Sequence, residues 1–169
     1  MSTLEDLQAH EQLRHGRLLR RAFIVVLAVL VVIDLTGLLG VHTSSKETDQ
    51  NGYQVRLDYP RFARAGQDVL WRVTLRHDGG FGKDPIVLAV SADYFDIFET
   101  QGFYPDPDTQ SATKRYVYYS YQPPPGDTMT VTFDAYIQPG SQIGRNATLA
   151  VTVGSTTVSR IGYHTWLAP

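Results

Sequence analysis

The chain has 169 residues, of which 43% are hydrophobic, and this is enough for one globular domain and an appendage. Its net charge is -2 with both signs scattered, so no basic stripe is present to pair with phosphates and nucleic-acid binding is excluded. Cysteine is absent, which excludes disulfides, thiol catalysis and cysteine-ligated metal sites.

Residues 1–21, which include "STLEDLQAHEQLRHGRLLRR", predict a short cytoplasmic helix at the N-terminus. Ser2 and Glu5 have the spacing of a capping box. Acidic residues precede basic ones, as the dipole of a helix favours. We therefore expect this helix to continue into the apolar segment that follows.

Residues 22–41, "AFIVVLAVLVVIDLTGLLGV", predict a transmembrane helix. As a helix this run is about 30 Å long, which matches the hydrocarbon layer of a membrane. Four arginines lie shortly before it, whereas only Lys46 and Arg56 follow closely, so the N-terminus is expected in the cytoplasm. The chain is thus predicted to be a single-pass protein of the bacterial inner membrane with a periplasmic or extracellular C-terminal domain. The competing interpretation is a cleaved signal peptide.

Asp34 places a carboxylate inside this apolar run. A central Asp costs about 2.5 to 3.5 kcal/mol in a membrane, and such carboxylates usually face protein or water. Gly37 and Gly40 follow at intervals of about one turn, and small residues let a second helix approach closely. Asp34, Gly37 and Gly40 are therefore predicted to contact a partner helix. Local water penetration around the carboxylate is the alternative.

The polar segment 42–52, "HTSSKETDQNG", is predicted to be a linker, and residues 53–169 a β domain. From Tyr53 onward apolar and polar residues alternate with a period of two, which is typical of strands with one buried face. The pattern predicts a mainly β fold, a seven-stranded antiparallel sandwich of immunoglobulin or fibronectin-III type. The predicted strands are Tyr53–Tyr59, Val69–Arg76, Ile86–Ser91, Arg115–Tyr121, Thr128–Ile137, Ala147–Val153 and Thr156–Thr165.

Three local features of this domain are predicted from the same pattern. Trp71, Val73, Phe133, Leu149 and Val151 lie on the apolar sides of their strands and are expected in the core. The "GS" pair at 154–155 suits a two-residue hairpin between the last two strands. The segment "ADYFDIF" at 92–98 is compatible with a helical turn that crosses between the sheets.

The fragments "VTLRHDGGF", "SADYFDIFE", "PPPGDTMTVTFDAYIQPG" and the terminal "TWLAP" follow one apolar helix. In this arrangement the chain resembles uncharacterised bacterial single-pass membrane proteins that carry an extracytoplasmic immunoglobulin-like β-sandwich. The resemblance implies topology and fold, and it implies no activity.

No catalytic residue, cofactor or metal site is expected, since nucleophile elbows, zinc-protease pairs, phosphate loops and dinucleotide fingerprints are missing. The five histidines, including His164, lack ligand spacing and are expected at the surface. An acidic cluster formed by Asp93, Asp96, Glu99, Asp106 and Asp108 leaves calcium binding open as an alternative to solvated loop acids.

Aromatic residues are concentrated in "DYFDIFETQGFYPDP" and "RYVYYSYQ". In the second segment both faces of one strand carry tyrosines, although only one face of a sandwich strand is core. Tyrosine-rich surfaces favour protein interfaces. The predicted interface residues are Tyr94, Phe98, Phe103, Tyr104, Tyr116, Tyr118, Tyr119 and Tyr121. Filling of the core by these rings and stacking on carbohydrate remain alternatives.

Together these features predict a non-catalytic accessory subunit of a larger bacterial membrane complex, possible classes being respiratory or photosynthetic assemblies. Its partners would be integral membrane proteins and the lipid bilayer, with no nucleic acid. The alternative is a membrane-tethered binding module for glycan or a secreted ligand.

Overall fold

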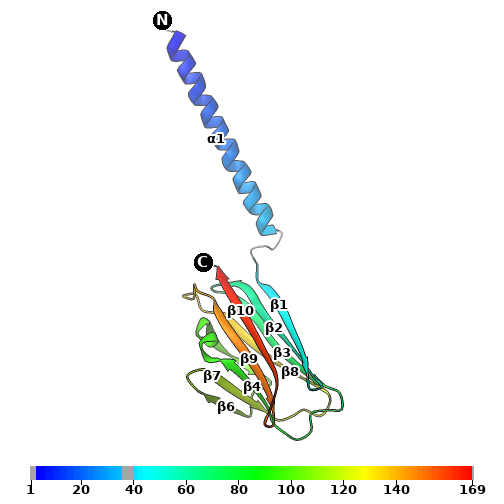
Figure 1. Ribbon diagram of the computed structural model, residues 1–169. Coiled ribbons are helices and arrows are strands. Elements are labelled where there is room, and N and C mark those ends of the chain that lie inside the picture. The colour runs from blue at the N-terminus through cyan, green and yellow to red at the C-terminus, as the bar shows by residue number, and fades with distance from the viewer. Residues whose placement is uncertain (1–2, 36–39, 169) are drawn as a thin grey trace. The chain divides into compact units, whose positions relative to one another are not determined.

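The computed structural model describes the backbone of residues 3–35 and 40–168, and the side chains of residues 16–32, 40–99 and 102–168 (Figure 1). The chain divides into two compact units, Met1–Gly40 and Val41–Pro169. The first unit contains the helix α1, and the second contains the ten strands of the described residues. The chain is therefore mainly β with one N-terminal helix, as the sequence predicts.

Helix α1 covers Thr3–Leu35. Within the described residues, no helix is both long enough and apolar enough to cross a membrane. This finding overturns the predicted transmembrane helix and the predicted location in the bacterial inner membrane.

The β domain contains more strands than the seven that the sequence predicts. All seven are present, and β1, β5 and β6 are added to them. The predicted linker 42–52 is largely strand β1, which corrects that prediction. The strands are β1 His42–Gln50, β2 Tyr53–Arg64, β3 Asp68–His77, β4 Ile86–Ser91, β5 Phe98–Tyr104, β6 Thr109–Ala112, β7 Tyr116–Tyr121, β8 Thr128–Ile137, β9 Arg145–Val153 and β10 Thr156–Ala168.

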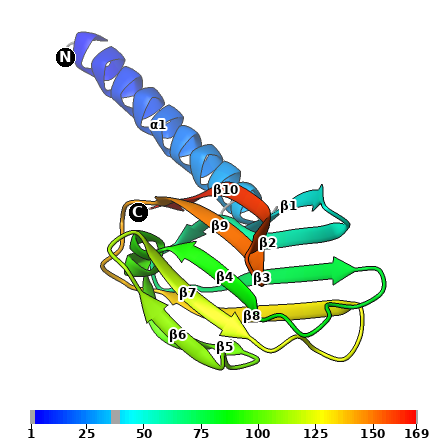
Figure 2. The same cartoon turned by 60° about the horizontal axis from the view of Figure 1, so that its bottom comes forward.

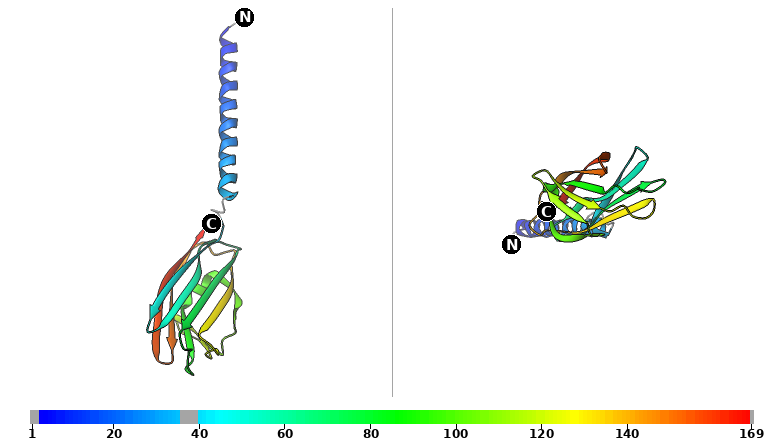
Figure 3. Two further views of the ribbon diagram at one scale, coloured as in Figure 1. Left: turned by 90° about the vertical axis from the view of Figure 1, so that its right-hand side faces the viewer. Right: turned by 90° about the horizontal axis from the view of Figure 1, so that it is seen from below.

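The strands β2 to β10 lie on one hydrogen-bonded path that curls into two layers, and β1 pairs with β2 off this path (Figures 1 and 2). One layer has the order β1-β2-β3-β8-β5, and the other has the order β10-β9-β4-β7-β6. The short 3-10 helix η1, Ala92–Ile97, joins β4 in one layer to β5 in the other. This confirms the predicted helical turn between the sheets. The layers are also visible in the end-on view of Figure 3.

Strand β2 belongs to both layers. Its first half, Tyr53–Asp58, pairs antiparallel with β3, while Phe62–Arg64 pairs parallel with Trp166–Ala168 of β10. Pro60 lies between these two halves, and a proline cannot donate a ladder hydrogen bond. The pairing of β2 with β10 thus joins the two layers along one seam.

The core fills the space between the layers. The five predicted core residues are all buried, which confirms the alternation in β3, β8 and β9. Trp71 on β3 donates from Nε1 to the hydroxyl of Tyr163 on β10 at 3.1 Å, so a hydrogen bond crosses the core. The predicted hairpin is confirmed as well, because Val153 pairs with Thr156 and Gly154 has a positive φ of 59°.

Candidate functional site

The predicted aromatic interface is mostly core. Tyr94, Phe98, Tyr119 and Tyr121 are buried, so the prediction that they form a surface is corrected. The alternation of side chains along β7 explains the burial of Tyr119 and Tyr121, since every second residue of a strand points to the same face. Burial raises the pKa of Tyr119 to about 12 and the pKa of Tyr94 and Tyr121 further still.

The other predicted interface residues differ in exposure. Phe103 is half-buried and stacks on Phe133 with ring centroids 4.7 Å apart, so it extends the core. Tyr116 and Tyr118 are half-buried on the outer face of β7. Tyr104 alone among the eight is strongly exposed, at 80%. These residues therefore do not form one aromatic surface.

The predicted intramembrane contact is only partly described. Asp34 lies in α1, but its side chain and the whole of Gly37 lie outside the described residues. Gly40 is described as a half-buried bend before β1. Among the described residues, no group of three or more His, Cys, Asp or Glu is placed to hold a metal ion, so the acidic cluster gains no support as a calcium site.

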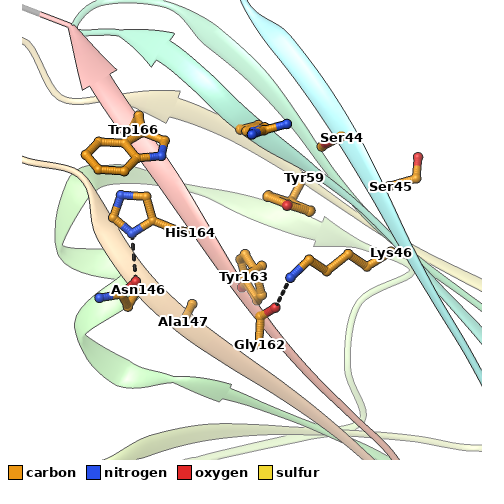
Figure 4. Close-up of a pocket in the computed structure, with 11 residues that line it drawn as sticks. Ser44, Ser45, Lys46, Tyr59, Asn146, Ala147, Gly162, Tyr163, His164 and Trp166 are labelled. Carbon is orange, nitrogen blue, oxygen red and sulfur yellow. Dashed lines mark hydrogen bonds between the residues drawn. The ribbon is translucent and has the colours of Figure 1, made fainter.

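A pocket of about 650 Å³ lies between β1, β2, β9 and β10 (Figure 4). The strands β1 and β9 flank the seam between β2 and β10. Segments that are distant in sequence therefore form the walls of the pocket. We call it the Trp166 pocket. It is lined by Ser44, Ser45, Lys46, Tyr59, Arg61, Asn146, Ala147, Gly162, Tyr163, His164 and Trp166.

Trp166 is held at this pocket by the alternation of β10. Ile161, Tyr163 and Thr165 point into the core, so His164 and Trp166 share the outer face. Their rings lie 4.2 Å apart at 64°, and Figure 4 shows them side by side. Trp166 is 60% exposed, which is unusual for so large an apolar ring.

His164 is oriented by Asn146, its cross-strand partner on β9. The ring nitrogen Nδ1 lies 2.8 Å from Asn146 Oδ1. Because this oxygen only accepts, Nδ1 is the donor and carries the proton. The other nitrogen, Nε2, is buried and has no hydrogen-bond partner among the described residues.

The charges that line the Trp166 pocket are positive. Lys46 reaches over from β1 and donates from Nζ to the carbonyl of Gly162. Arg61 on β2 is exposed and forms no ion pair with the described residues. The nearby Asp58 accepts hydrogen bonds from Arg56 and Ser45 instead. The pocket therefore combines an exposed aromatic ring, amide and hydroxyl groups, and two cations.

Such a set of groups is complementary to a ligand that has both an apolar face and polar substituents. A flat aromatic ring covers the apolar face of a ligand, and amides and hydroxyls fix its polar groups. This pocket was not predicted from the sequence, because Ser44, Ser45 and Lys46 were assigned to a linker. The available signal was Trp166, which stands on the polar side of an alternating strand, two residues after His164.

No family model matches the chain, and no curated protein matches it either. Among solved structures it is similar to a β-glucosidase from Listeria innocua, in crystal structures without ligand, with gluconolactone, and of a mutant with laminaribiose. The identities are 13 to 14%, and the TM-scores are 0.31 to 0.32. The match covers 76% of this chain and 16% of the β-glucosidase. At this level the likeness carries no argument about fold or function.

Proposed function

We propose that this chain is a non-catalytic binding module whose β domain holds a glycan at the Trp166 pocket. The observation that carries the proposal is the exposed ring of Trp166 beside Asn146, His164 and Lys46. A sugar ring has an apolar face and a rim of hydroxyls. An aromatic ring flanked by hydrogen-bonding groups is complementary to both.

The scaffold of this module is an immunoglobulin-like sandwich. The strand β2, which pairs first with β3 and then in parallel with β10, supports this assignment. The hydrogen-bonded order of the remaining strands supports it as well, since two antiparallel sheets pack face to face. Three additional strands distinguish it from the seven-stranded form.

Titration with soluble oligosaccharides tests the proposal. Trp71 is buried, so a change in tryptophan fluorescence on binding reports mainly on Trp166. We expect Trp166→Ala to abolish this response and the binding measured by calorimetry. Tyr104→Ala is the matched control, because it removes an even more exposed aromatic ring outside the pocket, and we expect it to leave binding unchanged. Equal binding by wild type and Trp166→Ala would refute the proposal.

A second candidate function is that of a structural subunit held in a larger protein assembly by α1. The observation that favours it is the exposure of the large apolar side chains between Leu18 and Val32, which ranges from 45 to 72%. Valines and leucines occupy all sides of this segment, and a helix that is apolar all round is normally covered.

Co-purification with substituted helices tests the second candidate. Phe23, Leu27 and Leu30 share one face of α1, while Val25, Val29 and Val32 share the opposite face. We expect serine substitutions on the face that contacts a partner to remove co-purified proteins, with the other triple variant as the control. Full recovery of the same proteins by both variants would contradict a role of α1 in assembly.

A further inference from the structure

A second pocket adjoins the Trp166 pocket. It has a volume of about 530 Å³ and is lined by Ser91, Asp93, Lys114, Arg115, Tyr116, Asn146, Ala147 and Thr148. Asn146 and Ala147 line both pockets, so the two share a wall at the start of β9. We call it the Tyr116 pocket. The two pockets are therefore neighbours on either side of these residues.

The two pockets repeat the same combination of groups. Each contains one aromatic ring that is at least partly exposed, Trp166 or Tyr116. Each also contains two cations, Lys46 and Arg61 in the first and Lys114 and Arg115 in the second. A surface that repeats one set of groups is complementary to a polymer that repeats one unit.

The cations are available to a ligand. All four are exposed, and none forms an ion pair with another described residue. One carboxylate, Asp93, lines the Tyr116 pocket, so the two pockets together hold four positive charges against one negative charge. The chain as a whole has a net charge of -2, which makes this excess local. A local excess of positive charge in a concave surface attracts anions.

We infer that the Trp166 and Tyr116 pockets form one groove for an acidic polysaccharide, a glycan with carboxylates on successive sugars. This inference rests on the proposed glycan-binding function and adds the charge and length of the ligand. The aromatic rings would cover sugar faces, the cations would pair with carboxylates, and Asn146 would bond hydroxyls at the junction.

The test uses the full chain and two matched probes, an oligogalacturonate hexamer and its fully methyl-esterified form. Esterification keeps the sugar backbone and removes the charges. We expect the acidic hexamer to bind about tenfold more tightly at low salt, and we expect added salt to reduce this preference. Equal affinity for both probes, with binding that still requires Trp166, would overturn the inference and leave the proposed function intact.

The Tyr116 pocket is tested by the double variant Lys114→Gln and Arg115→Gln. We expect it to weaken binding of the acidic hexamer about fivefold and to leave binding of the esterified hexamer unchanged. Lys83→Gln, at an exposed lysine outside both pockets, is the control and should match the wild type. A double variant that also matches the wild type would restrict the site to the Trp166 pocket and refute the continuous groove.

Two further outcomes separate the possible failures. Retention of all binding by Trp166→Ala would refute glycan binding at the Trp166 pocket, and with it the proposed function. Tighter binding of a single-stranded oligonucleotide with the same number of charges would replace the polysaccharide with nucleic acid as the ligand.

Discussion

The two tryptophans of this chain stand on alternating strands, yet their surroundings differ completely. Trp71 is buried, and its indole N–H is satisfied by the hydroxyl of Tyr163. Trp166 is exposed beside His164. The difference follows from the face of the strand on which each residue lies, because side chains alternate between core and solvent. One tryptophan therefore stabilises the fold while the other is free to contact a ligand.

Tyr163 predicts an alkaline limit to stability. Burial raises its pKa well above the ordinary value, and the nearby Tyr94 adds to this rise. The folded state therefore keeps a proton that the unfolded state loses above about pH 10, so this contribution to stability is complete below pH 10 and falls as the pH rises further. We expect the free energy of unfolding of Tyr163→Phe to fall less than that of the wild type as the pH rises above about 10.

Urea unfolding on both sides of about pH 10 measures the effect. Tyr104→Phe, at an exposed tyrosine, is the control and should show the same loss as the wild type. Other buried tyrosines remain in Tyr163→Phe, so the loss should be reduced and not abolished. An identical pH dependence in Tyr163→Phe and wild type would contradict the role of Tyr163.

Gly144 is predicted to be essential for the placement of Asn146. A Cβ at this position would lie 2.0 Å from the carbonyl oxygen of Thr165, so the backbone would have to shift. We expect Gly144→Ala to lower the free energy of unfolding by about 1 to 3 kcal/mol, measured by urea denaturation. Gly140→Ala is the control, because no atom lies within 4 Å of its Cβ position. An unchanged free energy of unfolding in Gly144→Ala would show that the backbone at Gly144 does not pack closely against Thr165.

At the scale of elements, Phe133 on β8 connects three segments. Its ring contacts Phe95 of η1 and Phe98 and Phe103 of β5. We expect Phe133→Ala to lower the free energy of unfolding by about 3 to 5 kcal/mol in chemical denaturation, because it removes a buried ring from this cluster. Thr132→Ala, on the other face of β8, should cost less than about 0.5 kcal/mol. A loss below about 1 kcal/mol for Phe133→Ala would contradict its place in the core.

Strand β1 is predicted to open more easily than the central strands. It pairs only with β2, and most of its side chains are exposed. Strand β3 lies between β2 and β8 and is buried on one face. We expect the amide protons of β1 to exchange with solvent roughly a hundredfold faster than those of β3, as measured by hydrogen exchange and NMR. Equal protection of the two strands would show that β1 opens only with the whole domain.

The elements that could be predicted from sequence are those with one buried face. The strands β2, β3, β8 and β9 alternate apolar and polar residues because one side of each faces the core. The strands β1 and β6 are exposed edges, and "HTSSKETDQ" and "TQSA" carry no apolar period that would reveal them. The Trp166 pocket was not predicted for the same reason, since Ser44, Ser45 and Lys46 in its wall belong to an edge strand.

At the scale of the whole molecule, the β domain has its own core. The buried apolar cluster consists of residues between Val55 and Tyr163, all in the second of the two compact units. We expect deletion of residues 1–40 to leave the thermal unfolding midpoint of the β domain within about 2 °C of the full chain. Scanning calorimetry of the two chains measures this. A larger fall would show that the first unit contributes to the stability of the second.

The pairing of β1 also determines how this molecule responds to tension. His42 lies opposite Phe62 at the start of an antiparallel pair, so a pull from the N-terminal side would separate β1 from β2 one residue pair at a time. Ser44, Ser45 and Lys46 belong to the first pairs to separate, and these residues form one wall of the Trp166 pocket. Tension on the chain before His42 would therefore open the Trp166 pocket, and would release a glycan bound there as proposed, while the core remained folded.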